Sequence, residues 1–313
     1  MSRYIHDKVN HRLKMVAGYD NSEELMKFAQ SLSNRNLLDN PWFTVNQRGF
    51  TSGQLTSPYY FVDRWMFTGT AEVNSDGTIT LSNTGNSDAY FVQRLPYADV
   101  AKLVDKPLVK SYDVVACSGT IYDYMGYYDS TNTYKLLETV KQISTTGIVE
   151  HNLTLSSFTP KSDKQFAEFT VNLNPGASIT IKAIKLELGT VSTLALDTAP
   201  NYATELLKCQ RYFYRQTFVK LQSIAHFDAS SNWIQAYIHI PKMRTSSPTL
   251  NISGALGYVS TNGESVAANS YSCAETLDGY IIGGPRATTG TSTTGYIFML
   301  DNDGGSISLS AEL

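Results

Sequence analysis

A run of aromatic and acidic residues at positions 121 to 129 is the part of the chain best suited to hold a ligand. It contains Tyr122, Asp123, Tyr124, Tyr127 and Tyr128 around a single glycine. Sugar rings stack on aromatic faces and hydrogen-bond to carboxylates, and tyrosine offers both apolar and polar contact at low entropic cost. The run therefore predicts a sugar-binding platform. The alternative, which the sequence leaves open, is that alternate tyrosines pack inside a sheet while the others cover its face.

A second candidate surface lies in the last third of the chain. Trp233, Gln235, Tyr237 and His239 occupy alternate positions there, and the positions between them are isoleucine or alanine. Because successive side chains of a strand point to opposite faces, this alternation predicts a strand with one core face and one outward face. The outward face is either a receptor surface or a subunit interface, where tryptophan is enriched.

The motifs of the common enzyme classes are missing from the sequence. A glycosidase needs two carboxylates held roughly 5 to 10 Å apart. Asp123 and Asp129 are close in sequence, as are Asp301 and Asp303, but such pairs are commonplace in turns. There is no HExxH, no GxSxG elbow, no GxxxxGK[ST] phosphate loop and no GxGxxG after a strand. We therefore expect a protein that is not an enzyme.

The low net charge argues against a nucleic-acid partner, and the cysteine content argues against disulfides and a cysteine metal site. The net charge is -3 and only 17% of residues are charged, so the chain has no basic field for nucleic acid. Cys117, Cys209 and Cys273 are odd in number and widely spaced, which argues against a disulfide framework and a CxxC metal site. They are interpreted as small packed hydrophobes. No cofactor is expected from these features.

The composition indicates a mainly β fold. There are 20 tyrosines and 13 phenylalanines, and Thr, Ser, Asn and Gly fill much of the remainder. Aromatic and small polar residues suit pleated, half-buried strands joined by turns. We expect two antiparallel, jelly-roll-like β-sandwiches, one over 36–198 and a C-terminal head domain over 217–313. A short connector helix over 199–216 joins them.

The first 35 residues have a different texture, rich in charge and helix formers. Ile5, Val9, Leu13 and Val16 fall at helical spacing on one face. Asn21 begins a capping-box pattern that predicts a second helix. A short helical pair cannot bury such a stripe alone, so we expect 1–35 to serve attachment or oligomerisation.

Three stretches resemble modules of phage and prophage tail-fibre or receptor-binding proteins. They are NLLDNPWFTVNQRG at 36–49, FVDRW at 61–65 and KLELGTVSTLALDTAPNYATELLKCQRYFYR at 185–215. The resemblance implies a carbohydrate-binding-like sandwich of the galactose-binding type, then a connector helix and a terminal β domain, usually in a homotrimer. In proteins of this kind the sandwich often carries a structural calcium ion, so one interpretation of Glu187 is that it is part of a calcium site. That residue could equally be an exposed strand position or a partner for Arg48 or Arg64, and no metal is predicted.

The function that this resemblance implies is adsorption to a host. The expected protein is a virion component of a bacteriophage tail, made in the host cytoplasm, which binds bacterial cell-surface polysaccharide non-covalently. Other tail proteins would dock through the N-terminal segment. The alternatives are a structural tail or baseplate connector without receptor contact and, with less support, a tail protein that degrades polysaccharide.

Overall fold

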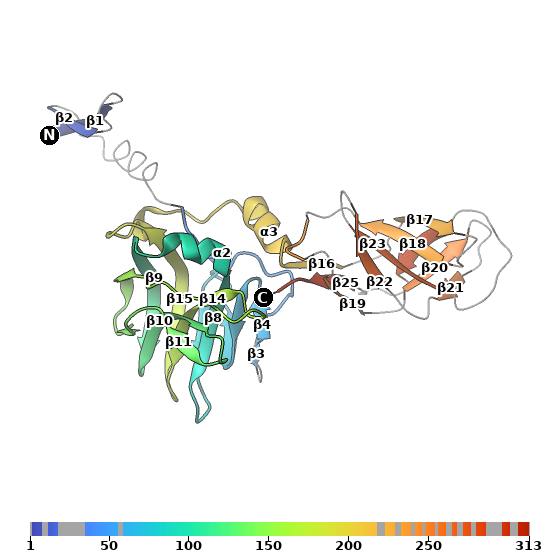
Figure 1. The fold of residues 1–313 in the computed structure, drawn as a ribbon, viewed down its shortest axis with the longest axis horizontal. Coiled ribbons are helices and arrows are strands. Elements are labelled where there is room, and N and C mark those ends of the chain that lie inside the picture. The colour runs from blue at the N-terminus through green and yellow to red at the C-terminus, as the bar shows by residue number, and fades with distance from the viewer. Residues whose placement is uncertain are drawn as a thin grey trace.

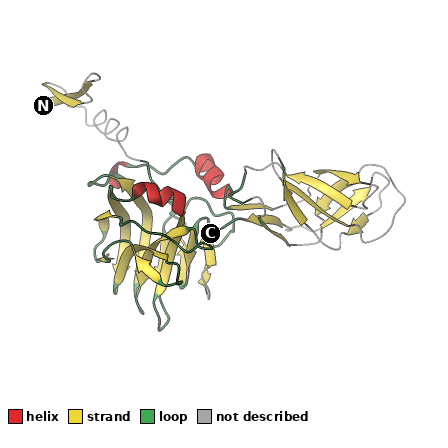
Figure 2. Cartoon of the chain, viewed as in Figure 1, coloured by secondary structure: helices red, strands yellow, loops and turns green. Residues whose placement is uncertain are grey.

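The protein is mainly antiparallel β-structure, as its composition predicts (Figures 1 and 2). The computed structural model describes residues 2–7, 12–17, 35–55, 59–217, 223–228, 233–238, 242–245, 248–253, 256–260, 265–267, 272–276, 280–285, 296–300 and 306–312. No helix within these ranges is long and apolar enough to cross a membrane.

The N-terminal residues form a hairpin, so the predicted first helix is wrong. Strands β1 (Ser2–Asp7) and β2 (Arg12–Ala17) pair antiparallel, with Ser2 opposite Ala17. A few apolar residues three or four apart fit a strand pair as well as a helix stripe, and the β-branched residues among them favour strands. The second predicted helix, which begins near Asn21, lies outside the described residues.

Residues 36 to 188 form a two-sheet sandwich. The front sheet runs in the order β11 (Tyr134–Leu136), β10 (Ile121–Tyr128), β14 (Phe166–Leu173), β8 (Ala89–Pro96), β5 (Trp65–Phe67) and β4 (Tyr59–Val62), with β12 (Lys141–Gln142) also paired to β10. The back sheet runs in the order β13 (Gly147–Thr154), β9 (Pro107–Ser118), β15 (Ser178–Leu188), β7 (Ile79–Ser82), β6 (Thr70–Val73) and β3 (Ser52–Gln54). Successive strands from β7 to β10 alternate between the sheets, which is the jelly-roll-like arrangement expected.

Aromatic rings fill the core between the sheets. Trp65 is fully buried and stacks on Phe91, with 4.5 Å between ring centroids and 14° between planes. Phe43 meets the Trp65 ring edge-on at 5.8 Å. The contact of Phe43 with Trp65 therefore packs the segment before β3 against the front sheet, in which Trp65 and Phe91 lie.

The polar pair inside FVDRW forms the turn between β4 and β5. Arg64 has φ +72°, a left-handed conformation that costs a non-glycine residue free energy. Its guanidinium is fully buried and bonds to Asp39 at 3.2 Å and to Glu312 at 3.0 Å. Asp63 bonds instead to Arg48 at 3.4 Å, so the two neighbours do not pair with each other.

Four short helices accompany the strands in the described part of the chain. Three are single turns: α2 (Tyr97–Val100), η1 (Ala101–Leu103) and η2 (Leu194–Leu196). The connector helix α3 (Tyr202–Gln210) begins at Asn201, whose side-chain oxygen accepts hydrogen bonds from the backbone N–H groups of Ala203 and Thr204. The helix ends before the predicted 216, because residues 213–217 are taken up by a strand that pairs with the C-terminal strand.

The C-terminal region contains two further antiparallel sheets. The smaller has the order β16 (Phe213–Thr217), β25 (Ser306–Ser310), β19 (Thr249–Ser253). The larger has the order β21 (Ser265–Ala267), β20 (Leu256–Ser260), β24 (Tyr296–Leu300), β17 (Ser223–Asp228), β18 (Trp233–Ile238), β23 (Tyr280–Pro285), β22 (Ser272–Glu275). Strand β25 brings the C-terminal residues back beside the sandwich, where Glu312 meets Arg48 and Arg64 (Figure 1).

Candidate functional site

Alternation along β10 divides the tyrosine-rich run between two faces of the front sheet. Ile121, Asp123 and Met125 are fully buried between the sheets. Because side chains alternate along a strand, Tyr124 and Tyr128 point outward. The run is therefore split, with one set of side chains in the core and the other on the outer face.

Outward side chains of the front sheet line a groove of about 350 Å³. They come from β5 and the residue after it, from β8, β10, β11 and β14: Met66, Thr68, Tyr90, Val92, Arg94, Tyr124, Tyr128, Tyr134, Glu168 and Thr170. The strand register brings them together, since Thr170 is opposite both Tyr124 and Val92. The volume falls within the range typical of small-ligand pockets, about 300 to 1,000 Å³.

One wall of the groove is built of three tyrosine rings. Tyr134 on β11 meets Tyr128 edge-on, with 5.1 Å between centroids, and meets Tyr124 edge-on at 6.2 Å. Gly126 lies beneath Tyr134, where a Cβ atom would come within 2.6 Å of its ring. The glycine of the tyrosine-rich run therefore lets the Tyr134 ring lie against the sheet.

A charge pair crosses the floor of the groove. The Arg94 Nε atom donates to Glu168 Oε1 at 2.9 Å, and the Arg94 guanidinium lies 4.5 Å from the centre of the Phe166 ring. Glu168 is opposite Arg94 in the register of β14 and β8. Since the two charges compensate each other and Glu168 is the one carboxylate among the lining residues, the groove carries no net charge.

The tyrosine side chains of the groove are neutral. Burial raises the pKa of Tyr124 and Tyr134, and Glu168 raises them further, so both phenols stay protonated at neutral pH. The buried hydroxyl oxygens of Tyr134 and Thr170 have no hydrogen-bond partner of acceptable geometry in the described structure. They lie close enough to each other that a hydrogen bond with Thr170 offsets part of the pKa rise of Tyr134.

The structure separates the residues of the tyrosine-rich run. Tyr124 and Tyr128 line the groove, whereas Tyr122 shares their face but pairs with Gln142 of β12, beyond the lining residues. Tyr127 packs inward against Phe158, with 5.0 Å between ring centroids. Tyr127 is therefore a packing residue, and the alternation left open by the sequence describes the run correctly.

Asp123 belongs to a buried network instead of the outer face, which corrects its predicted place. Its carboxylate accepts from the Tyr112 hydroxyl at 2.8 Å, lies 2.7 Å from His151 Nδ1 and contacts Lys110 Nζ. Burial alone would raise the pKa of Asp123, but His151 and Lys110 outweigh it and lower the pKa. Its side chain is fully buried and cannot reach a ligand in the groove.

The second predicted surface is tested only in part. Residues 233–238 form strand β18, as the alternation predicts, and pair with β17 and β23. The side chains of Trp233, Gln235 and Tyr237 lie outside what the structure describes, and so does His239 altogether. Whether this face touches a receptor or another subunit stays a prediction.

Several groove residues were not found from the sequence. They are Tyr90, Arg94, Tyr134, Glu168 and Thr170. The alternation within YFVQRL already places Tyr90 and Arg94 on one face, and that within FAEFTVNL does the same for Glu168 and Thr170. The missing information was the strand order β11-β10-β14-β8, which joins these faces into one surface.

The described residues hold no group of three or more His, Cys, Asp or Glu side chains arranged to bind a metal ion. Glu187, the ambiguous acidic residue, is fully buried. It accepts from the backbone N–H and the hydroxyl of Thr193, each at 2.7 Å, and lies 3.5 Å from Lys185 Nζ. It pairs with neither arginine proposed as its partner, and it fastens the loop after β15 to the back sheet.

Comparison with known proteins shows similarity only at the level of solved structures. No protein-family model matches the sequence, and no curated protein matches it. A structure described as "CBM4 structure and function" is 14% identical, with 40% of this chain and 95% of that chain covered and a TM-score of 0.33. TmCBM61 in complex with beta-1,4-galactotriose is 13% identical, with 50% and 99% covered and a TM-score of 0.28. The CBM22-1-CBM22-2 tandem domain of Paenibacillus barcinonensis Xyn10C is 11% identical, with 89% and 98% covered and a TM-score of 0.30.

Proposed function

We propose that the protein binds glycan non-covalently in the groove on the outer face of the front sheet. The observation that carries the proposal is the three-tyrosine wall beside the neutral Arg94–Glu168 pair. Tyrosine rings supply apolar area for a sugar face, and the hydroxyl and ionic groups supply hydrogen bonds for its edges. The absence of net charge favours neutral sugars over acidic ones.

The groove is suited to binding and not to bond cleavage. Hydrolysis of a glycosidic bond by paired carboxylates needs a second acidic group opposite the first. Glu168 is the one carboxylate lining the groove, and its charge is already paired with Arg94. We therefore propose a non-catalytic role, which predicts no release of reducing ends when host polysaccharide is incubated with the protein.

A glycan array tests the groove directly. The unaltered protein is expected to bind a set of neutral glycans. Tyr124→Ala and Tyr128→Ala should each weaken that binding about tenfold, because each removes one ring of the wall. The matched control is Tyr202→Ala, which removes a 54% exposed tyrosine from α3 and should leave binding unchanged. Full binding by both groove variants would rule out this site.

At the level of the organism, we propose a tail-fibre or receptor-binding component of a phage virion that acts as a homotrimer. The support is the resemblance of 36–49, 61–65 and 185–215 to that family. Trimerisation would raise a weak single-site affinity, because several grooves engage one surface together. Sedimentation should give three times the 34.6 kDa chain mass.

Competition for host cells tests the adsorption role. Purified protein added before the particle should block adsorption to cells that carry the glycan. The Tyr124→Ala variant should block poorly, since it keeps the fold but loses part of the groove. If the protein binds no envelope preparation of any host, a structural connector becomes the better explanation.

A further inference from the structure

The outer face of the front sheet continues past the groove along the strands. The groove contains a row formed by Val92, Thr170 and Tyr124, which lie opposite one another on β8, β14 and β10. Two residues further along the same strands, and therefore on the same face, lies a second row. Its members are paired across β8, β14, β10 and β12: Tyr90, Asn172, Tyr122 and Gln142. Because Tyr90 also lines the groove, the two rows form one continuous surface.

The second row has the dimensions of a site for one further sugar residue. Tyr90 is 39% exposed, Gln142 is exposed and Tyr122 is half-buried. Tyr122 points outward, because Ile121 and Asp123 on either side of it are fully buried between the sheets. A two-residue step along a strand separates the rows by about 7 Å, and two strand spacings separate Tyr90 from Tyr122 by about 10 Å. One sugar ring therefore fits between these two tyrosines when another occupies the groove.

Asp88 places a carboxylate at the end of the second row. It is exposed, and it lies on the outer face with Tyr90, since Ala89 between them is buried. Its Oδ2 atom accepts from Asn172 Nδ2 at 3.1 Å, which holds the carboxylate beside the row. The carboxylate forms no ion pair with any residue that the structure describes. A carboxylate has about four acceptor positions, so Asp88 can accept further hydrogen bonds from a ligand.

The charge of Asp88 acts on the tyrosines of the groove. Burial raises the pKa of Tyr90, and Asp88 raises it further. Asp88 also adds to the rise that burial causes in the pKa of Tyr124. Protonated phenols therefore lie near a carboxylate that only accepts hydrogen bonds. This combination suits sugar hydroxyls, which both donate and accept, and the unpaired negative charge disfavours an acidic sugar.

We propose that the groove and the second row form one site for a neutral oligosaccharide of at least two residues, and that Asp88 determines its specificity. One sugar residue packs against the tyrosine wall of the groove, and the next lies between Tyr90 and Tyr122. Asp88 accepts from neighbouring hydroxyls of that second residue. This inference rests on the proposed glycan binding, to which it adds the length and the hydroxyl pattern of the glycan.

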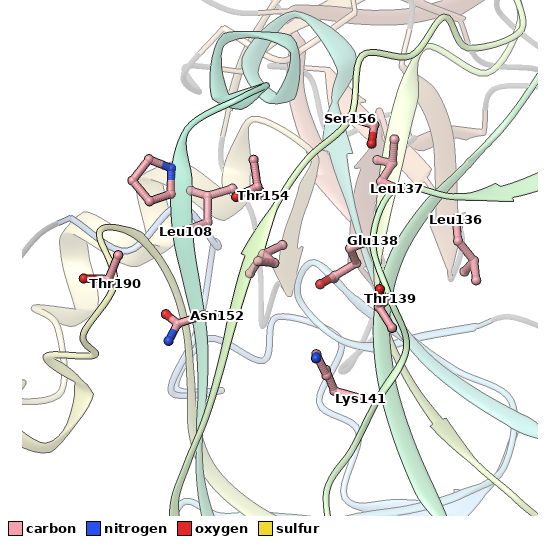
Figure 3. Close-up of a pocket in the computed structure, with 12 residues that line it drawn as sticks. Leu108, Leu136, Leu137, Glu138, Thr139, Lys141, Asn152, Thr154, Ser156 and Thr190 are labelled. Atoms are coloured by element: carbon pink, nitrogen blue, oxygen red, sulfur yellow. The ribbon is translucent and has the colours of Figure 1, made fainter.

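The cavity at the edge of the sandwich supplies a control position away from this surface. Its volume is about 620 Å³, and it lies where β13 and the start of β9 face the segment between β11 and β12 (Figure 3). None of its described lining residues is aromatic, and it shares no lining residue with the groove. Asn152 lines this cavity and is exposed, so its side chain can be removed without touching the proposed site.

Calorimetric titration with sugars of increasing length tests the extent of the site. The probes are the monosaccharide, disaccharide and trisaccharide of three β-1,4-linked neutral series, built of glucose, galactose or N-acetylglucosamine. In the series that binds, the disaccharide should bind at least tenfold more tightly than the monosaccharide. Equal affinities at all lengths would overturn this inference alone. No binding of any series would count against the proposed glycan binding and, with it, against this inference.

Variants assign the added affinity to the second row. Asp88→Asn and Tyr122→Ala should each lower the ratio of disaccharide to monosaccharide affinity about tenfold, because each removes a contact to the second residue. Tyr124→Ala should weaken the binding of both sugars. Asp99→Asn, which alters an exposed carboxylate on α2, and Asn152→Ala should change neither affinity.

Two outcomes of the variant series would contradict the proposal. An unchanged affinity ratio in both Asp88→Asn and Tyr122→Ala, together with weaker binding by Tyr124→Ala, would show that the ligand ends at the groove. A lower ratio in Tyr122→Ala alone would show that Asp88 does not determine specificity. Circular dichroism of each variant verifies that the fold is retained, so that a lost affinity reports on the contact.

Discussion

Gly126 gives the groove its shape by lacking a side chain. A Cβ atom on residue 126 would lie only 2.6 Å from atoms of the Tyr134 ring, so the ring uses the space that a side chain there would need. Tyr134 also touches the rings of Tyr124 and Tyr128, so its position decides the width of the wall. A single methyl group on the sheet would therefore alter three aromatic side chains at once.

Gly126→Ala should push Tyr134 away from the sheet and weaken glycan binding. Overpacking of this kind costs about 1 to 3 kcal/mol of stability. Affinity for an array-selected glycan and the free energy of unfolding in urea are the two measurements. Gly85→Ala is the matched control, because its Cβ would meet only the Asn83 side chain at 3.4 Å, and it should change neither quantity. Unchanged glycan affinity in Gly126→Ala would show that the Tyr134 wall is not used.

Asp63 is a buried carboxylate whose titration acts on folding. Burial raises its pKa from 3.8 to about 6, although Arg48 and the Gln47 N–H groups oppose the rise. Between these two pH values the folded state binds more protons than the unfolded state. Stability therefore falls as pH rises through this window, by about 2 to 3 kcal/mol at roughly 1.4 kcal/mol per pKa unit.

Comparison of the unaltered protein with Asp63→Asn isolates this contribution. Denaturation in urea at several pH values from 3.5 to 7 should show that the unaltered protein loses stability relative to the variant on going from about pH 4 to about pH 6. Glu138 and Asp123 also have shifted pKa values, but they are present in both proteins and cancel in the difference. Parallel stability curves would mean that Asp63 has the same pKa in the folded and unfolded states.

At the scale of elements, helix α3 is held to the sandwich by its acidic first turn. Glu205 is buried, and its Oε2 atom accepts from the Asn40 backbone N–H at 3.0 Å. The cap residue Asn201 satisfies two backbone donors at the start of the helix. Together they place α3 between the end of the sandwich and strand β16.

Removal of the Asn201 side chain, which caps α3, should lower the free energy of unfolding. Asn201→Ala is expected to cost about 1 kcal/mol, because two N–H groups lose their acceptor. Asn201→Asp retains an acceptor oxygen and should cost much less. Chemical denaturation followed by circular dichroism compares the three proteins. Equal losses in both variants would indicate that Asn201 acts through contacts other than the cap.

At the scale of the whole molecule, the C-terminal residues are fastened to the sandwich by buried charge. The Glu312 carboxylate forms ion pairs with two arginines. Its Oε1 atom lies 3.1 Å from a guanidinium nitrogen of Arg48, and its Oε2 atom lies 3.0 Å from one of Arg64. Arg64 also lies 3.4 Å from the centre of the Tyr212 ring, and Arg48 lies 3.6 Å from that of Phe213. The end of the chain thus completes a network that begins in the FVDRW turn, more than two hundred residues earlier.

Glu312→Ala should destabilise the protein by about 3 to 5 kcal/mol, because it leaves the fully buried Arg64 short of a partner. Asp99→Ala breaks the exposed Asp99–Lys102 pair, whose side chains are about 70% exposed, and should cost about 0 to 1 kcal/mol. Thermal unfolding of both variants measures the contrast. A small loss in Glu312→Ala would mean that Asp39 alone compensates Arg64.

Local patterns in the sequence were enough for much of this picture. Aromatic and small polar composition predicted antiparallel sheets, and the connector helix predicted over 199–216 is present as the shorter α3 at Tyr202–Gln210. Alternation along a strand was one of the two interpretations that the sequence left open for the tyrosine-rich run. These features depend on neighbours along the chain, so sequence reasoning can reach them. The N-terminal hairpin was not predicted, because the few apolar residues there fit both a helix and a pair of strands. The pairing of β1 with β2 determines which of the two forms.

Only the tertiary structure decided which side chains line the groove. Tyr134 reaches Tyr124 only because β11 folds back on β10, and Glu168 reaches Arg94 only because β14 lies beside β8. Asp123 looked like a ligand residue until the packing of the two sheets placed it beside Lys110 and His151. Sequence spacing sets the face on which a side chain lies, but long-range strand order sets its neighbours, and binding depends on the neighbours.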